Sequence, residues 1–135
     1  MANASVRWVS GKRFIGVDST NHSVVLSTPD EGVGMKPSDL LLVALASCTA
    51  VDVVDILVKK HMLLTSLEIA VSGEQDSDPP WTFRKIHLIY RVGGKALTEK
   101  AIEQAIQLSE EKYCSVAATV RGVAEITTSF EIFPE

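Results

Sequence analysis

The feature that most constrains the fold is the apolar run "DLLLVALASCTAVDVVDIL" at residues 39–57. Pro37 suits the first position of a helix, where its missing backbone N–H is not needed. The basic residues Lys59 and Lys60 suit the negative end of the helix dipole. The first half of the segment has almost no polar face, and a helix that is apolar all round is buried. We therefore expect a buried helix from Pro37 to about Lys60, with Cys48 inside it.

The segments on either side of this helix predict six strands and two further helical pieces. Three β-branched segments before it, "SVRWV", "FIGVD" and "SVVLS", indicate a three-stranded meander. After it, "SLEIAVSG" and "IHLIYRV" alternate apolar and polar residues, which is typical of a long hairpin. "LTEKAIEQAIQL" indicates an amphipathic helix with Thr98 as its N-cap, and "EEKYCSVAATV" a shorter helical piece before the last strand, "AEITTSFEIF". The order βββ-α-ββ-α-α-β predicts an α+β fold.

The length of the chain limits how the central helix can be covered. At 135 residues we expect a single domain spanning residues 1–135. Six short strands are few for covering a helix that is apolar on every side. A homodimer in which two copies share one core is the simplest way to cover it.

Charge and hydropathy exclude several classes of partner. The formal net charge is −4 and no basic stripe with interleaved aromatic residues occurs, so we expect no nucleic-acid partner. The N-terminal segment lacks the continuous apolar core of a signal peptide, and the apolar run at residues 40–51 is too short to span a bilayer. We therefore expect a cytoplasmic protein with no membrane partner, in which Cys48 and Cys114 are normally reduced.

Cys48 is the first of two candidate reactive residues. It lies about three turns into the expected helix, beyond the reach of the helix dipole. Its apolar neighbours, and the carboxylates of Asp52 and Asp55 on the same face, disfavour a thiolate. Those carboxylates either mark where the helix emerges into solvent or hold a cation that the thiol needs. Activation requires a cation from another segment or subunit, and the candidates are Arg7, Lys12, Arg13, Arg84 and Arg121.

Cys114 lies in a different setting. "KYCSVAAT" indicates a helix start with Cys114 or Ser115 near the N-cap, where the positive end of the dipole lowers the pKa of a thiol. The two cysteines are 66 positions apart, so neither a CxxC motif nor a metal-ligand spacing is present. The histidines His22, His61 and His87 also have no spacing partner. These spacings therefore disfavour a zinc site and a Cys–His dyad.

Two motifs together resemble a known family. They are "KPSDLLLVALASCTAVDVV" and, 66 positions later, "EEKYCSVAATV". The "LSTP" segment before the first cysteine and the strand that contains Trp8 fit the same pattern. Over nearly its whole length the sequence is similar to the OsmC/Ohr family of thiol peroxidases.

The resemblance implies both an architecture and a reaction. The architecture is an intertwined α+β homodimer, with two long central helices packed back to back and each active site at the dimer interface. Cys48 would attack an organic hydroperoxide and become a sulfenic acid, in defence against oxidative stress. Cys114 would resolve it to a Cys48–Cys114 disulfide, which an external dithiol then reduces, with no metal or prosthetic group.

The chain departs from the peroxidase branches of this family at the activating residues. Those branches carry an Arg in a "GGRDG"-like turn after the first strand, and a Glu directly after the helix-opening Pro. Here the turn reads "SGKRFIG", and Ser38 takes the Glu position. The resemblance therefore implies that Arg13, or Lys12 beside it, stabilises the thiolate and that Asp39 holds this cation.

Three functions are compatible with these residues. The first is a Cys-based organic hydroperoxide reductase, which the two cysteines favour. The second is a binding module or redox sensor for a small apolar or thiol-reactive ligand, which the missing Glu after Pro37 favours. The third is another thiol-dependent enzyme, such as a transferase or a hydrolase.

Overall fold

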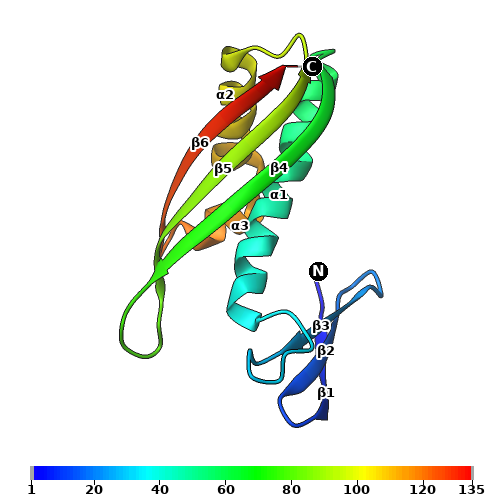
Figure 1. Cartoon of the computed structure of the whole chain (residues 1–135), viewed down its shortest axis with the longest axis vertical. Coiled ribbons are helices and arrows are strands. Elements are labelled where there is room, and N and C mark those ends of the chain that lie inside the picture. Colours follow the sequence, from blue (N-terminus) through cyan, green and yellow to red (C-terminus); the bar gives the residue numbers. More distant parts are fainter. Residues whose placement is uncertain (1, 135) are drawn as a thin grey trace. The chain divides into compact units, whose positions relative to one another are not determined.

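The structure, a computed structural model, describes residues 2–134. Its elements follow the order βββ-α-ββ-α-α-β that the sequence predicts, with a π-helical turn added before the last helix. The α+β prediction is therefore confirmed. The elements are β1 (Ser5–Ser10), β2 (Arg13–Val17), β3 (Ser23–Ser27), α1 (Pro37–Lys59), β4 (Leu63–Gln75), β5 (Phe83–Lys95), α2 (Glu99–Leu108), the π-helical turn η1 (Ser109–Tyr113), α3 (Ser115–Val120) and β6 (Glu125–Pro134) (Figure 1).

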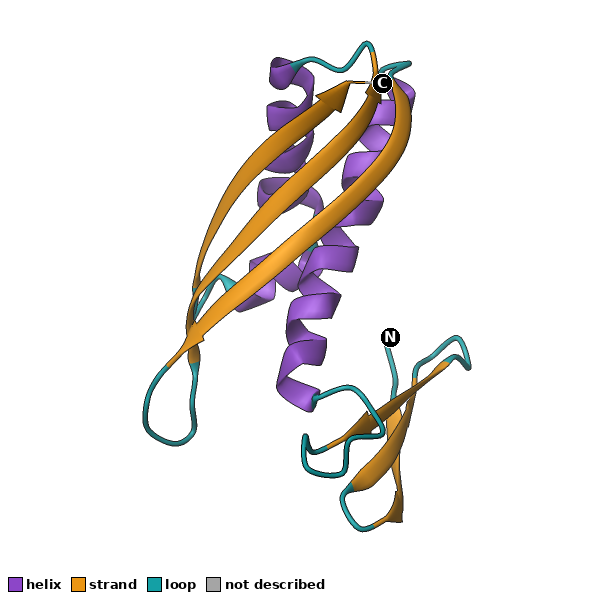
Figure 2. Ribbon diagram, viewed as in Figure 1, coloured by secondary structure: helices purple, strands orange, loops and turns teal. Residues whose placement is uncertain are grey.

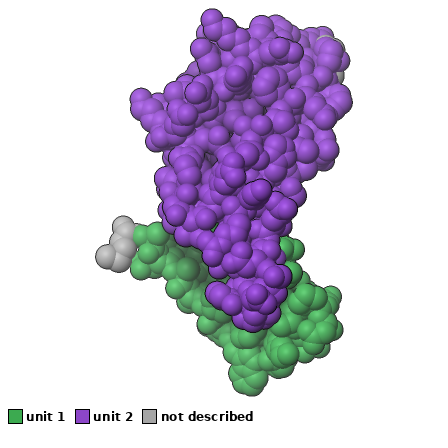
Figure 3. All heavy atoms as spheres, turned by 90° about the vertical axis from the view of Figure 1, so that its left-hand side faces the viewer, with its two compact units in different colours: residues 1–41 green, residues 42–135 purple. Residues whose placement is uncertain are grey.

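The chain divides into two compact units, residues 1–41 and residues 42–135 (Figure 3). Unit 1 is an antiparallel sheet in the order β1-β2-β3, as the meander prediction requires. Among its described residues only Leu26 and Ser27 are buried. On β1, Val6 and Trp8 are 67% and 65% exposed. Unit 1 therefore has almost no core of its own.

Unit 2 contains a second sheet, in the order β4-β5-β6. β4 and β5 form the long hairpin that the sequence predicts, and β6 pairs in parallel with the other side of β5. Parallel pairing requires a crossover connection, which α2, η1 and α3 supply. Figure 2 shows the helices of this unit on one face of the sheet. The residues of β5 that alternate toward this core are fully buried: Ile86, Leu88, Tyr90 and Val92.

Helix α1 is covered by its own chain along one stripe only. It spans Pro37–Lys59, within one residue of the predicted end. Its buried residues are spaced four apart, and they are Leu45, Thr49, Val53 and Leu57. Val51 and Val58, outside this stripe, remain 67% and 57% exposed. A single chain thus leaves uncovered part of the apolar surface that the sequence predicts to be buried.

The apolar character of α1 extends beyond the run at residues 40–51. By length and composition alone, the whole helix is long and apolar enough to cross a membrane. The core helix of a soluble protein passes the same test. Here the second half of the helix also carries Asp52 and Asp55.

The segment after β5 begins as predicted and then departs from regular α-helix. The Thr98 hydroxyl accepts the Ala101 N–H at 3.2 Å, so Thr98 is the N-cap of α2. At Ser109 the helix changes to the π-helical turn η1, which the sequence does not predict. The Cys114 N–H donates to the Ser109 carbonyl at 2.7 Å and closes this turn. Single π-helical turns are rare and occur frequently at functional sites.

Candidate functional site

The structure brings Cys48 and Cys114 together inside unit 2. Cys48 lies midway along α1, and Cys114 directly precedes α3. Both thiols are free, and they lie close enough for Cys48 to raise the pKa of Cys114. The two residues become neighbours because α1 and α3 pack into the same core, where Leu45 and Ala117 are among the buried residues.

Cys114 is the N-cap of α3, as the sequence predicts, but the predicted direction of its pKa shift is wrong. Its Sγ accepts the Ala117 N–H at 3.3 Å. Burial, followed by the interaction with Cys48, raises the pKa of Cys114 to about 11. The N–H groups of Ala117 and Val116 lower this pKa by less. A helix of six residues supplies little dipole, so desolvation of a thiol that is 2% exposed prevails.

Cys48 is half-buried against the core, and the two carboxylates that follow it have different roles. Asp52 is partly buried and accepts the Ser109 hydroxyl at 2.8 Å, which neither predicted alternative foresees. Asp55 is 70% exposed and lies 3.9 Å from Lys59, as expected where the helix meets solvent. Asp52 thus ties α1 to the π-helical turn that precedes Cys114.

The structure places a buried hydroxyl, that of Tyr90, near the thiols. The sequence motifs did not identify this residue. Tyr90 on β5 and Thr49 on α1 are both 0% exposed. The pKa of Tyr90 is raised to about 12, mainly by burial. Thr49 acts in the opposite direction, whereas Glu110, Cys114 and Asp52 contribute to the rise. The sequence did hold a signal for this residue, because Tyr90 is the one hydroxyl-bearing residue in the inward-facing stripe of "IHLIYRV".

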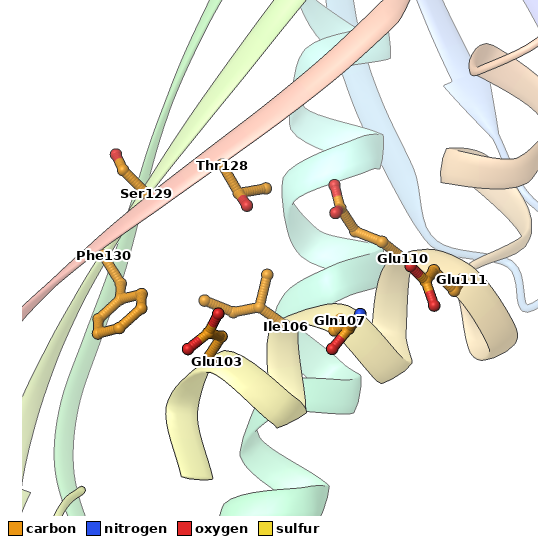
Figure 4. A pocket seen from close by; sticks show the side chains of 8 residues that line it. All are labelled: Glu103, Ile106, Gln107, Glu110, Glu111, Thr128, Ser129 and Phe130. Atoms are coloured by element: carbon orange, nitrogen blue, oxygen red, sulfur yellow. The ribbon is translucent and has the colours of Figure 1, made fainter. Parts of the chain in front are cut away.

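A cavity of about 480 Å³ lies beside Glu110, with α2 and η1 along one wall and β6 along the other (Figure 4). Three glutamates line it: Glu103, Glu110 and Glu111. Burial raises the pKa of Glu110, although Arg121 acts in the opposite direction. Glu110 Oε1 is buried and has no hydrogen-bond partner among residues 2–134. The cavity is therefore lined by three carboxyl groups, and burial raises the pKa of one of them, Glu110.

The three arginines of unit 2 are engaged with other groups. Arg84 pairs with Asp76 at 3.0 Å, and Arg121 donates to the Glu110 carbonyl at 2.6 Å. Arg91 contacts Glu68 at 2.7 Å. Two of the cations that the sequence offers for Cys48, Arg84 and Arg121, thus have other partners.

In unit 1, the predicted activating residues do not contact one another in the way the resemblance implies. Arg13, at the start of β2, pairs with Glu31, a partner that the motifs do not identify. Asp39 lies exposed in the first turn of α1, where its N–H donates to the Lys36 carbonyl at 3.0 Å. Lys12 is exposed beside Arg13. The carboxylate that holds Arg13 within unit 1 is therefore that of Glu31.

The histidines add no metal site to this picture. His87 contacts the Thr127 hydroxyl through Nδ1 at 2.6 Å and the Ser129 hydroxyl through Nε2 at 3.0 Å, across β5 and β6. Across the part of the chain that the structure describes, no cluster of three or more His, Cys, Asp or Glu side chains could hold a metal ion.

Comparison with known proteins places this geometry in a family. The model of the OsmC-like protein family matches residues 28–129, which include both cysteines. The chain is 33% identical over 129 residues to protein YhfA of Escherichia coli K12, covering 96% of each chain.

Solved structures agree with this match. A hypothetical protein from Aquifex aeolicus is 31% identical and has a TM-score of 0.90, with 100% of this chain and 98% of that chain covered. The organic hydroperoxide resistance protein OhrB of Bacillus subtilis shares the fold, with a TM-score of 0.65 at 17% identity over 97% of this chain and 98% of that one. The chain belongs to the OsmC-like protein family.

Proposed function

We propose that the protein is a Cys-based peroxidase that reduces organic hydroperoxides and serves in oxidative stress defence. The observation that carries the proposal is the proximity of two free thiols that lie far apart in sequence, close enough for Cys48 to raise the pKa of Cys114. Attack of the Cys48 thiolate on the O–O bond gives a Cys48 sulfenic acid and an alcohol. The Cys114 thiol then condenses with the sulfenic acid to a disulfide and releases water.

The contrast between the two thiols supports this assignment of roles. Cys48 is the more accessible of the two, whereas Cys114 is 2% exposed and has a pKa of about 11. A buried neutral thiol is a poor first nucleophile, because the thiolate is the reactive form. It is well placed as a resolving group, since it lies close enough to Cys48 to interact with that thiol. An external dithiol completes the cycle by reducing the disulfide.

The names of related structures favour the same chemistry. Two proteins that share the fold of this chain, one from Legionella pneumophila and one from Bacillus subtilis, are described as organic hydroperoxide resistance proteins. For activation of Cys48 we propose a cation from unit 1. Arg13 is the first choice and Lys12 the second, with Glu31 or Asp39 as the carboxylate that orients the cation.

We propose a homodimer as the active form. The exposed valines of α1 motivate it: Val51, Val54 and Val58 lie three and four residues apart on one helix face. The exposed apolar residues of β1, Val6 and Trp8, are a second surface that needs cover. We further propose that the protein acts in the cytoplasm and needs no metal or cofactor. We also propose that it is a single domain, because the family match includes residues of both units.

The alternative function is a binding module or redox sensor for a small apolar or thiol-reactive ligand. The engagement of Arg84, Arg91 and Arg121 with other groups favours it, because a thiol without a cation reacts slowly with peroxide.

One equivalent of cumene hydroperoxide separates the two functions. The peroxidase should be oxidised to a Cys48–Cys114 disulfide, detected by mass spectrometry of non-reduced peptides. Cys114→Ser should accumulate a sulfenic acid on Cys48, trapped by dimedone, and Cys48→Ser should consume no peroxide. Turnover by Cys48→Ser at the rate of the parent would overturn the mechanism. No reaction in the parent would favour the binding module.

A further inference from the structure

The Tyr90 hydroxyl is the least satisfied polar group near the thiols. Tyr90 is 0% exposed, and its hydroxyl has no hydrogen-bond partner among residues 2–134. Thr49 lies beside the phenol, but the contact falls short of hydrogen-bond geometry, and the Thr49 hydroxyl donates to the Ala46 carbonyl at 3.0 Å. Leaving a buried hydroxyl unpaired costs about 1–3 kcal/mol, and each such group in a native structure needs an explanation.

The neighbours of Tyr90 indicate what the phenol is positioned to meet. It lies within electrostatic reach of Cys114, and Cys114 in turn interacts with Cys48. Thr49, which also interacts with the phenol, is the residue after Cys48 on α1. The hydroxyl is thus close to the place where an oxygen atom is added and removed during the proposed cycle.

The charged and titratable groups around the phenol come from three elements. They are Asp52 on α1, Glu110 on η1 and Cys114 before α3. Asp52 is already bonded to Ser109, and Arg121 lies against the Glu110 carbonyl. Asp52, Glu110 and Cys114 each raise the pKa of Tyr90. Burial raises it most, and together these causes bring it to about 12. The phenol therefore remains a hydrogen-bond donor at all pH values at which the protein functions.

We propose that the Tyr90 hydroxyl donates a hydrogen bond to the oxygen of the Cys48 sulfenic acid and assists its departure as water. This inference rests on the proposed function. When the Cys114 sulfur attacks Cys48, the new S–S bond forms and the Cys48 S–O bond breaks. The leaving oxygen takes the phenol proton, and the proton lost by Cys114 restores the phenol. The sum is one thiol and one sulfenic acid converted to one disulfide and one water, with no further reactant.

Tyr90→Phe tests the proposal, because it removes the hydroxyl and keeps the ring. After a single pulse of cumene hydroperoxide, peroxide consumption should stay within about twofold of the parent. Conversion of the sulfenic acid to the disulfide should slow by about tenfold or more, measured by dimedone trapping at timed intervals. That factor corresponds to about 1.4 kcal/mol in the barrier. The matched control is Tyr113→Phe, which alters the only other tyrosine, 55% exposed and next to Cys114. It should match the parent.

Two further measurements separate this role from a structural one. Tyr90→Phe removes a hydroxyl that has no partner, so the free energy of unfolding should be unchanged or higher. Diamide oxidises the same thiol pair through a nitrogen leaving group, so disulfide formation with diamide should proceed equally fast in Tyr90→Phe and the parent. Equal slowing with diamide and with peroxide, or equal sulfenic acid lifetimes in Tyr90→Phe and the parent, would overturn the proposal.

Failure of the Tyr90 role can be distinguished from failure of the proposed peroxidase function. If the parent does not react with cumene hydroperoxide, the proposed function fails. Excess hydrogen peroxide then supplies the Cys48 sulfenic acid chemically, and its lifetime in Tyr90→Phe and the parent still tests Tyr90. In a Tyr113→Phe background, replacing Tyr90 by fluorotyrosine gives a stronger donor of nearly the same shape. It should shorten the lifetime of the sulfenic acid, and a longer or equal lifetime would contradict the assignment.

Discussion

Unit 1 and unit 2 bury their apolar residues to very different extents. In unit 2, Leu57, Leu88 and Tyr90 are 0% exposed, whereas in unit 1 the side chains of Val6 and Trp8 stay largely in contact with solvent. Both sheets have three strands, so the number of strands is not the cause. Unit 2 has helices to pack on its sheet, and the described part of unit 1 ends within the first turns of one. Unit 1 by itself thus leaves most of its apolar side chains in contact with solvent.

The same comparison holds for the chemistry. Both thiols and Tyr90 lie in unit 2, while Arg13, Lys12 and Asp39 lie in unit 1. The proposed reactive thiols and the proposed activating cation thus belong to different units of the chain. The following substitutions test each part of this contrast, beginning with the largest expected effect.

Leu57→Ala should lower the free energy of unfolding by about 2–5 kcal/mol, because it leaves a cavity in the packed core of unit 2. The counterpart in unit 1 is Val9→Ala, at a side chain that is 52% exposed, and it should cost less than about 1 kcal/mol. Urea unfolding followed by circular dichroism measures both. A cost for Val9→Ala equal to that of Leu57→Ala would show that unit 1 is as well packed in solution as unit 2.

Val51→Asp should weaken association by about 100-fold or more, roughly 2.7 kcal/mol, because it places a charge in the centre of the proposed helix–helix contact. Val123→Asp is the control, at a similarly exposed valine in the turn before β6. Sedimentation equilibrium at micromolar concentration distinguishes monomer from dimer. A folded monomer in the parent, or a dimer that tolerates Val51→Asp, would remove the proposed interface.

Arg13→Ala should slow the reaction of Cys48 with hydroperoxide by about tenfold at neutral pH, equivalent to about 1.4 kcal/mol, with partial recovery at alkaline pH. Lys12→Ala, at the neighbouring position, should have the smaller effect. Arg prefers a planar carboxylate that it can hold bidentately, which leaves a donor for the sulfur. Alkylation of Cys48 as a function of pH in the three proteins measures it. Identical profiles would exclude both cations and redirect attention to Arg7.

Glu110→Gln should have the smallest effect, on the pH dependence of stability. Burial raises the pKa of Glu110 above its ordinary value of 4.5, so the folded state holds this proton more tightly than the unfolded state. The resulting stability is complete below 4.5 and is lost as the pH rises through the higher folded pKa. Glu110→Gln should therefore be more stable than the parent at neutral pH, and the difference should vanish in acid.

The control for that experiment is Glu111→Gln, in the same cavity but exposed. Its stability should follow the parent across the pH range when unfolding by urea is measured at several pH values. If Glu111→Gln and Glu110→Gln give the same curve, the burial of Glu110 is not the cause.

The central helix, the strand order and the caps could be predicted because each depends on residues that are close in sequence. Pro37 begins α1 as expected, Thr98 caps α2, and the alternation in "IHLIYRV" gives the buried face of β5. The environment of Cys114 could not be predicted in the same way. Its position at a helix start was correct, but the local dipole is outweighed by burial under other segments, so its pKa rises rather than falls.

The sequence by itself determined the strands, the α-helices, their order along the chain and the family, because periodicity, capping and the two cysteine motifs are local properties. Only the tertiary structure decided that Asp52 bonds to Ser109, that Arg13 pairs with Glu31, and that the Tyr90 hydroxyl is enclosed near two neighbouring thiols. The Asp52–Ser109 contact, the pairing of the thiols and the burial of Tyr90 each join segments far apart along the chain. Hydrogen bonds and desolvation depend on distance in space, and spacing along the chain does not encode that distance.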